Sequence, residues 1–305
     1  MPSISQILAA SYPAVIAKRP ANQWAESAVL RSLEKLGAIK RTNMGETIEV
    51  PLDYQANPGT QELATDMAPT STSKTEVLTA ASYAVGSISV PIVWSKEDEA
   101  KNEEQKVELV GSLIDNALES HDDQVETLLF TTGNRVIGLD TLVTEDGTGT
   151  IGGIVAGTDI FWKNKFKDYT DASALLADLT SVFNACSKGS GSPQMPKLIV
   201  TSADSHAVYE GKLQANQRYI DAKDAQGGFI SLAFKTANMV FSQRYTSDSY
   251  FFLNPKNFQV RVSKKMWRYK DREAKLPNAE AYGTSLFSVL QVVTDNRSRL
   301  GVAFT

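Results

Sequence analysis

Apolar residues first recur at helical spacing near the N-terminus. In the stretch NQWAESAVLRSLEKLGAIK, four apolar residues fall near one face, namely Trp24, Ala28, Leu33 and Leu36, which is typical of a helix packed against a core. Asn22 can cap the start of this helix, and Gly37 stands where a helix often ends in left-handed geometry. The pattern therefore predicts an amphipathic helix that ends at Gly37.

Polar and apolar residues alternate in the two runs that follow, TIEVPLDY and YAVGSISVPIVWS. The period of two and the β-branched residues predict two strands, and a long polar segment rich in Thr, Ser and Ala joins them. Pro51 and Pro91 each remove a ladder donor, which suits edge strands. Because an isolated hairpin is marginally stable in water, we expect either a disordered surface loop or an arm that lies on a neighbouring subunit.

A long helix is predicted from Ser95 to Phe130. Ser95 and Asp98 resemble a capping box, and acidic residues fill the first turns. An apolar stripe then recurs at three- and four-residue steps through Val107, Val110, Ile114, Ala117, His121, Val125 and Leu128. At about 1.5 Å per residue, this helix is roughly 50 Å long. Since His121 lies on the stripe, we interpret it as a partly buried, hydrogen-bonded residue rather than a metal ligand or a proton-transfer group.

A compact α/β unit follows. The stretch DASALLADLTSVFNACSK places Leu175, Leu179, Val182 and Cys186 on one helical face, with Asp171 as its cap. PKLIVTS has the pattern of a buried strand, and ADSHAVYEGKL that of a helix. Three strand-rich stretches complete the chain: FISLAFKTANMVFSQRY, SYFFLNPKNFQVRVS and SLFSVLQVVTDNRSRLGVAFT. Cys186 is then most simply a buried, small apolar residue.

Composition excludes several classes of protein. The chain has 305 residues, 42% of them hydrophobic and 22% charged, as in ordinary soluble proteins of about two domains. A net charge of -4 gives no general attraction to nucleic acid. With one cysteine and two histidines, His121 and His206, no Cys/His zinc cluster can form. A metal site made of carboxylates stays open, but we expect neither a metal nor a cofactor.

The N-terminal stretch ISQILAASYPAVIA makes a poor signal peptide. No basic residue precedes it, and Pro13 interrupts it. No apolar run in the chain approaches the roughly 20 residues that a membrane span requires. We therefore expect an intracellular protein that is soluble at synthesis and does not associate with a membrane.

Gly147, Gly149 and Gly152 spell G-x-G-x-x-G. In a dinucleotide-binding fold, a strand leads into this loop and a helix leaves it. The preceding VIGLDTLVTED has no strand that leads directly into the turn, and the glycines and β-branched residues of GIVAGTDIFWKNKF would make a costly first helical turn. We interpret the loop as a connection between strands; a dinucleotide-binding oxidoreductase remains the alternative of a different class.

A second cluster contains the residue types of a hydrolase. Ser202, Asp204, Ser205 and His206 are close in sequence on a predicted helix, but adjacent helical residues do not face one another. No G-x-S-x-G elbow surrounds either serine. We therefore predict no catalytic residues and no enzyme activity.

Four stretches in a fixed order carry a resemblance: GLDTLVTEDGTGTIGGIVAGTDIFWKNKF, LTSVFNACSKGSGSPQMPKLIVTSADSHAVYEGKLQANQRYID, GGFISLAFKTANMVFSQRY and YFFLNPKNFQVRV. Together they resemble the major capsid proteins of tailed double-stranded DNA bacteriophages, which have the Hong Kong 97 type shell fold. The resemblance covers most of residues 138–262. It implies an α+β protein with an N-terminal arm (1–44), an extended hairpin loop (45–95), a peripheral domain with a long spine helix (96–169), an α/β axial domain (170–245) and strands that return to both domains (246–305).

The same resemblance implies a function. The chain would assemble with copies of itself, through pentamers and hexamers, into an icosahedral shell around phage DNA. Its location would be the virion, after assembly in the host cytoplasm, and its other partners would be portal, scaffolding and decoration proteins. Since Met1 is followed almost directly by the arm, we expect scaffolding to be a separate protein. The closest alternative is an encapsulin shell, which shares the architecture and holds enzymes.

Some members of the capsid family crosslink a loop lysine to an asparagine of a neighbouring subunit. Lys74 lies near the expected loop tip, but the sequence identifies no acceptor and no acid catalyst near it. We therefore predict no crosslink.

Basic and aromatic residues are interleaved in VSKKMWRYKDREAK. Trp267 and Tyr269 lie among the cations Lys264, Lys265, Arg268, Lys270, Arg272 and Lys275. Such a mixture can bind phosphates and stack on bases. Because Asp271 and Glu273 interrupt it, we favour ion pairs with acidic residues of adjacent subunits, such as those at the start of the spine helix. Contact with packaged DNA, which would be weak and salt-sensitive, is the alternative.

Overall fold

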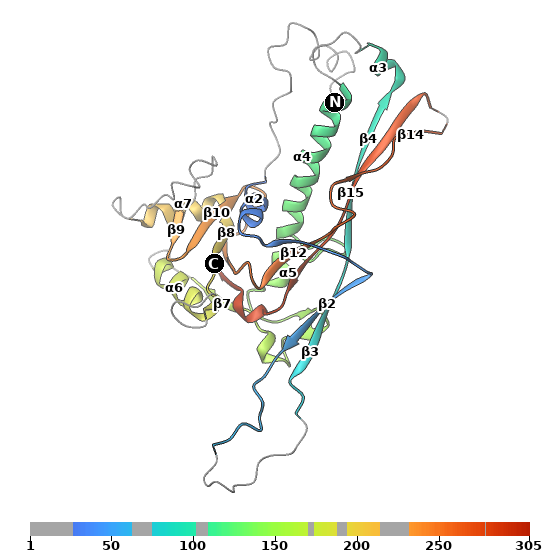
Figure 1. Ribbon diagram of the computed structural model, residues 1–305. Coiled ribbons are helices and arrows are strands. Elements are labelled where there is room, and N and C mark those ends of the chain that lie inside the picture. Colours follow the sequence, from blue (N-terminus) through green and yellow to red (C-terminus); the bar gives the residue numbers. More distant parts are fainter. Residues whose placement is uncertain are drawn as a thin grey trace.

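The computed structural model describes residues 27–62, 75–101, 109–169, 174–187, 194–213, 232–277 and 279–305. Two six-stranded sheets form its framework (Figure 1). One sheet runs beside the long helix α4, and the other carries helices α6 and α7. A two-stranded hairpin, β2–β3, extends away from both sheets at the lower end of the view.

The longest strand, β15 (Ala281–Thr294), organises the first sheet. It pairs antiparallel with β4 (Gly86–Ser95) on one side, and its C-terminal part pairs antiparallel with β12 (Phe258–Ser263). Strand β1 (Ile39–Thr42) adds to β12 in parallel. Two short strands, β13 (Tyr269–Lys270) and β14 (Ala274–Lys275), complete the sheet along β15.

Helix α4 (Leu109–Phe130) packs on one face of this sheet. Ala117 of the helix forms a small buried cluster with Ile92 and Trp94 of β4. The predicted stripe is confirmed at Ala117, His121 and Val125, all of which are buried. At about 1.5 Å per residue, the helix is roughly 33 Å long.

A shorter helix, α3 (Lys96–Lys101), precedes α4. The amide of Asp98 donates to Ser95 Oγ over 3.0 Å, and that hydroxyl donates to the Asp98 carboxylate, so the predicted capping pair is confirmed. Residues 102–108 lie outside the described residues. The prediction of one continuous helix from Ser95 to Phe130 therefore stays a prediction.

The second sheet has the strand order β7-β16-β11-β8-β10-β9. These strands are β7 (Lys165–Asp168), β16 (Gly301–Phe304), β11 (Ser249–Leu253), β8 (Leu198–Ser202), β10 (Ala237–Ser242) and β9 (Leu232–Phe234). Helices α6 (Leu175–Cys186) and α7 (Ala203–Lys212) contact it and share one apolar cluster with it. The predicted helix and strand at 175–186 and 198–202 are confirmed.

Cys186 is part of this cluster. Its side chain is fully buried, and a Cβ added to Gly301 would lie 2.6 Å from its sulfur. Burial raises the pKa of this thiol to about 12. The predicted role of Cys186 as a small apolar residue is confirmed.

Helix α2 (Ala28–Lys35) ends as predicted, with Gly37 at a φ of +70°. Its start differs from the prediction, because the N-cap position is Ser27 rather than Asn22, and Ser27 makes no side-chain cap bond. The amide of Leu30 instead donates to the carboxylate of Glu126 on α4. The carboxylate of Glu126, which is distant in sequence, thus accepts from a backbone amide for which the sequence predicts a local capping residue.

The extended hairpin has different strands from those predicted. Strand β2 (Thr47–Asp53) pairs with β3 (Leu78–Ala84), whereas β4 leaves the hairpin and pairs with β15. The predicted second run therefore divides at Val85. Gly86 lies where the chain changes from one sheet to the other. A Cβ at that position would lie 2.4 Å from the Val136 side chain, so a larger residue would clash there.

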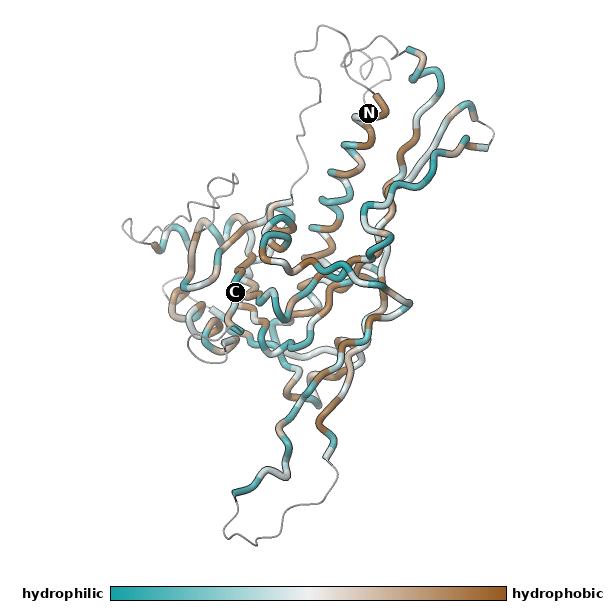
Figure 2. The backbone as a smooth tube through the Cα atoms, in the orientation of Figure 1, coloured by the Kyte–Doolittle hydropathy of each residue, from teal (hydrophilic) through white to brown (hydrophobic). Residues whose placement is uncertain are grey.

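Hydropathy follows this arrangement. Figure 2 shows hydrophobic segments where the two sheets meet and along α4, while residues 54–62, which continue from β2, are mainly hydrophilic. In β2 the burial alternates, with Ile48, Val50 and Leu52 buried and the residues between them exposed. One side of the hairpin thus packs against the body, and the other faces solvent.

Candidate assembly surfaces

The inner side of the β2–β3 hairpin is held by a second, smaller hairpin. Strands β5 (Thr150–Ile151) and β6 (Ile154–Val155) pair antiparallel around a two-residue turn. The amide of Ser82 on β3 donates to the Gly152 carbonyl over 2.9 Å. The Trp162 indole donates to the Ile151 carbonyl over 3.0 Å, which fixes this turn against the body.

Of the three glycines of the G-x-G-x-x-G stretch, only Gly152 lies in that turn, while Gly147 and Gly149 precede β5. The turn has no dinucleotide-binding geometry. Gly152 and Gly153 have φ values of +61° and +80°, as a two-residue hairpin turn requires. A strand, β6, follows the turn where a nucleotide site would need a helix. A Cβ at Gly152 would lie 2.7 Å from that of Ala81, so the residue permits close packing of two hairpins. The interpretation as a connection between strands is confirmed for Gly152, which joins β5 and β6.

The outer side of the β2–β3 hairpin is acidic. Its described residues, 45–62 and 75–84, contain five carboxylates and no lysine or arginine. The five are Glu46, Glu49, Asp53, Glu62 and Glu76, and all are exposed. Glu49 accepts a hydrogen bond from Ser82 Oγ, but none of the five has an ion-pair partner within the described part of the chain.

Helix α4 connects three parts of the molecule through acidic side chains near its C-terminal end. Glu126 is fully buried and accepts hydrogen bonds from the Leu30 amide of α2 and the Ser242 hydroxyl of β10. Asp123 forms an ion pair with Arg244 over 2.7 Å. The sequence pattern does not predict these contacts, because Glu126 is a charged residue next to the apolar stripe and would be expected to face solvent.

Asp122 joins the same helix to the basic segment. Its carboxylate receives two hydrogen bonds of 2.7 Å from Arg268 Nη2 and lies 3.0 Å from His121 Nδ1. Burial raises the pKa of Asp122, but the bond from His121 and the guanidinium charge outweigh it and hold the pKa below its usual value. The imidazole of His121 packs edge-on against Trp267, with ring centres 5.1 Å apart. His121 is thus fully buried and hydrogen-bonded.

The basic segment, residues 264–275, is divided by these contacts. Arg268 is held by Asp122, and Lys270 pairs with Glu273 over 2.8 Å. Lys264, Lys265 and Arg272 are exposed and have no ion-pair partner among the described residues. The sequence therefore found the cations, but not the helix residue that binds Arg268 within the same chain.

Two other basic residues border the segment. Lys40 and Arg41 lie on β1, whose last residue accepts a hydrogen bond from the Lys264 amide through its carbonyl. Both side chains are exposed. The parallel pairing of β1 with β12 brings this strand, which is 223 or more residues earlier in the chain than Lys264, next to the start of the segment. Because Lys40 and Arg41 are consecutive strand residues, their side chains point to opposite faces of the sheet.

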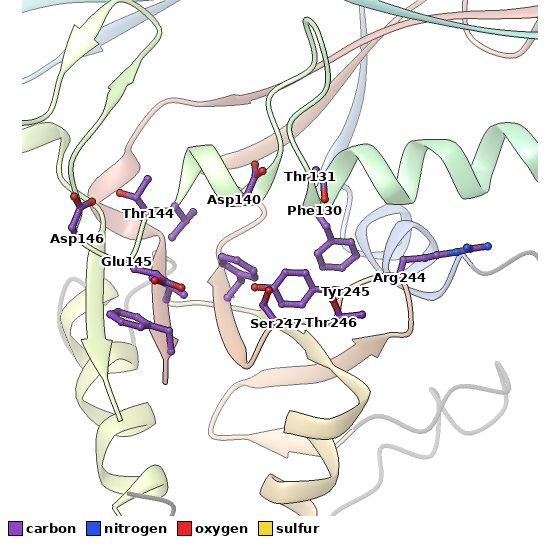
Figure 3. Close-up of a pocket in the computed structure, with 14 residues that line it drawn as sticks. Phe130, Thr131, Asp140, Thr144, Glu145, Asp146, Arg244, Tyr245, Thr246 and Ser247 are labelled. Carbon is purple, nitrogen blue, oxygen red and sulfur yellow. The ribbon is translucent and has the colours of Figure 1, made fainter. Parts of the chain in front are cut away.

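A cavity of about 720 Å³ lies between the end of α4 and the second sheet (Figure 3). Phe130 and Tyr245 stack within it, with ring centres 5.0 Å apart. Asp140 and Asp146 line it, but they accept hydrogen bonds from Thr132 and Thr148, respectively. The bonds from Thr148 hold the pKa of Asp146 at about 2. These carboxylates stabilise local turns, and the cavity shows no paired acid and base.

The hydroxyl and imidazole groups of α7 do not form a catalytic array. Ser202 Oγ accepts from the Ser205 amide as a helix cap, and Ser205 Oγ donates to Asp248. His206 packs against Phe241 instead, at 5.0 Å between ring centres. Burial lowers the pKa of this histidine. The serines and the histidine thus have separate, structural contacts.

Within the described residues, no group of three or more His, Cys, Asp or Glu residues could hold a metal ion. None of the helices described is long and apolar enough to cross a membrane.

Solved structures resemble the chain over nearly its whole length, although no protein-family model and no curated protein matches its sequence. The capsid of cyanophage A-1(L) superposes with a TM-score of 0.75 at 16% identity, covering 95% of this chain and 97% of that chain. The capsid of the Myoviridae phage XM1 gives 0.62 at 13% identity, covering 94% and 95%. The encapsulin of a complex from Synechococcus elongatus gives 0.57 at 9% identity, covering 93% and 92%. The chain therefore has the fold of these shells.

Proposed function

We propose that this chain, which has the Hong Kong 97 type shell fold, is the major capsid protein of a tailed double-stranded DNA bacteriophage. It assembles through pentamers and hexamers into an icosahedral shell that encloses the DNA. The observation that carries the proposal is the likeness to the cyanophage capsid, which covers 95% of this chain and 97% of that chain.

The hairpin supports self-association independently. Its outer side is exposed along both strands, and a lone two-stranded ribbon gains little stability in water. A neighbouring subunit would supply the missing partner. Each subunit of a shell makes several such contacts at once, so modest contacts together stabilise the whole.

The proposal assigns a structural role without catalysis to the chain and places it in the virion, after assembly in the host cytoplasm. Residues 1–44 serve as the arm, 45–95 as the extended loop together with strand β4, which joins the first sheet, 96–169 as the peripheral domain, 170–245 as the axial domain and 246–305 as strands that return to both. Portal, scaffolding and decoration proteins are its further partners. Packaged DNA makes only non-specific, salt-sensitive contacts with the inner surface.

An encapsulin-like shell is the second candidate, because an encapsulin also covers more than nine-tenths of the chain. The two candidates differ in cargo rather than in fold. Nucleic acid inside purified particles supports the capsid, whereas a protein cargo supports the compartment. The oxidoreductase alternative has less support, since a strand, β6, follows Gly152 where a nucleotide site would need a helix.

Electron microscopy of the purified protein, together with sedimentation at several salt concentrations, tests the proposal. We expect closed shells, tubes, or free pentamers and hexamers. A compact monomer under every condition, with no particles, would refute self-assembly.

A further inference from the structure

We propose that the cavity between the end of α4 and the second sheet binds a linear polyamine, a flexible chain of methylene groups that carries two or more ammonium ions. A single copy of the chain supplies the residues that line this cavity, so the inference goes beyond the proposed shell function and does not depend on it. The volume of about 720 Å³ lies within the range of about 300–1,000 Å³ that is typical of small-molecule sites.

The floor of the cavity is one end of a sheet face. It is lined by Phe251, Val302 and Phe304. Phe251 pairs with Val302, and Phe304 is two residues further along the same strand as Val302, so all three side chains lie on one side of the second sheet. Ala303, between the last two, belongs to the apolar cluster that α6 and α7 share with the other side. Phe304 is only partly buried, so the floor offers an accessible apolar surface.

Aromatic rings form the wall next to this floor. Tyr245 stacks on Phe130, with 5.0 Å between the ring centres and 17° between the ring planes, and its ring centre lies 5.4 Å from that of Phe251. The face of an aromatic ring attracts an ammonium group, and a methylene chain packs on apolar surface while its charged groups stay solvated. The wall therefore fits both parts of an alkylammonium chain.

The rim of the cavity is negatively charged. Asp140, Glu145 and Asp146 line it and are exposed, and none of them has an ion-pair partner within the described residues. Arg244 also lines the cavity, but its guanidinium is bound to Asp123 over 2.7 Å and points away from the rings in Figure 3. The rim thus has an excess of negative charge.

The rim and the aromatic wall face the same space. In Figure 3, the side chain of Glu145 points toward Tyr245 and Ser247. Burial raises the pKa of Tyr245, and the negative charges of Glu145 and Asp140 add to this rise, so both carboxylates act on the ring. An alkyl chain that lies along the rings would therefore have these carboxylates within reach of its ammonium groups.

The arrangement of the carboxylates favours an elongated cation. Among the residues that the structure describes, no three ligand side chains converge well enough to hold a metal ion, so the charges of the rim are spread out. Asp140 and Asp146 are also fixed in place by hydrogen bonds from Thr132 and Thr148. Separate, fixed carboxylates match ammonium groups that methylene linkers hold apart. A lysine side chain of another protein carries only one ammonium group and would leave part of the rim unpaired.

Calorimetric titration of the nucleic-acid-free protein with spermidine tests the inference. We expect saturable binding of about one spermidine per chain, weakened by roughly tenfold in Glu145→Lys and by roughly threefold in Glu145→Gln at low salt. Glu145 makes no hydrogen bond or ion pair within the described residues, so neither change should disturb the fold, which far-UV circular dichroism checks. Glu76→Lys is the matched control, because Glu76 is an exposed residue of the β2–β3 hairpin and the change in net charge is the same. This control should bind spermidine like the wild type.

Proton NMR of spermidine tests the aromatic wall. Its methylene protons should shift upfield on binding, because they would lie over ring faces, and Tyr245→Leu should remove most of this shift. Mg²⁺, which has charge but no apolar stem, and the amide of N-acetyl-lysine, which has a single ammonium group, should each bind more weakly than spermidine.

Two results would overturn the inference. If spermidine binds Glu145→Lys as tightly as it binds Glu76→Lys and the wild type, it does not occupy this cavity. If Mg²⁺ or the amide of N-acetyl-lysine binds as tightly as spermidine, the site does not select a linear polyamine. Because the titration needs no particles, a protein that never assembles would refute the proposed function and leave the spermidine result as it stands.

Discussion

Replacing the buried carboxylate of Glu126 by an amide should loosen the junction of α2, α4 and β10. Glu126 is fully buried and accepts hydrogen bonds from two donors, the Leu30 amide and the Ser242 hydroxyl. In Glu126→Gln, the amide oxygen can still accept from the Leu30 amide, and the NH2 group can donate to the Ser242 oxygen. The proton of the Ser242 hydroxyl then loses its acceptor.

The expected cost follows from these contacts. One buried donor without a partner costs about 1–3 kcal/mol, and the bond that remains loses the strength given by a charged acceptor. We therefore expect a loss of about 2–4 kcal/mol. That is a large share of the 5–15 kcal/mol by which a domain is typically stable.

Hydrogen exchange of unassembled subunits measures this effect locally. The peptide that covers α2 should exchange faster in Glu126→Gln, because the Leu30 amide begins the helix, and the urea midpoint should fall. Glu119→Gln is the matched control, since Glu119 is an exposed residue of the same helix. Equal exchange and equal midpoints in the two variants would refute the reasoning.

Gly152→Ala should destabilise the protein by about 1–3 kcal/mol more than Gly149→Ala, because both place a side chain at positive φ but only the Cβ at 152 meets Ala81, at 2.7 Å; equal urea midpoints would argue against hairpin packing there. Asp122→Asn should cost about 1 kcal/mol at pH 7. Because the folded pKa of Asp122 lies below 3.8, this contribution is present above about pH 4 and is lost as the pH falls through the folded pKa, so wild type and variant should converge in acid unfolding. Burial lowers the folded pKa of His206 below 6.5, so the unfolded chain takes up a proton first and stability falls as the pH drops below 6.5. His206→Gln should reduce that fall between pH 7.5 and 5.5, and an unchanged pH dependence would show that another group causes it.

Local sequence patterns predict those helices and strands that have a regular apolar spacing or a characteristic residue at their end. The stripe Leu175, Leu179, Val182 and Cys186 is buried as its spacing predicts, and Gly37 ends α2. Partners that are far apart in sequence leave no such signal. Strand β3, with the sequence LTAASYA, has few β-branched residues, and it is a strand because β2 lies beside it.

The candidate surfaces show the same limit. Spacing identifies the cations of residues 264–275, but their division into held and free side chains depends on Asp122, which is 146 residues from Arg268. The alternation of β2 is visible in the sequence, whereas its pairing with β3 is not. Consequently, the sequence shows the carboxylates, but only the fold shows that they are exposed together on one hairpin.

The reactivity of the buried Cys186 thiol can report on local opening of the protein. With a pKa of about 12, only about one thiol in 100,000 is ionised at pH 7, and the thiolate is the reactive form. Because the side chain is fully buried, alkylating reagents can reach it only after the packing around it opens, for example between α6 and the strand that carries Gly301. The rate of labelling at this single cysteine therefore measures how often the packing around it opens, in a free subunit or within a finished particle.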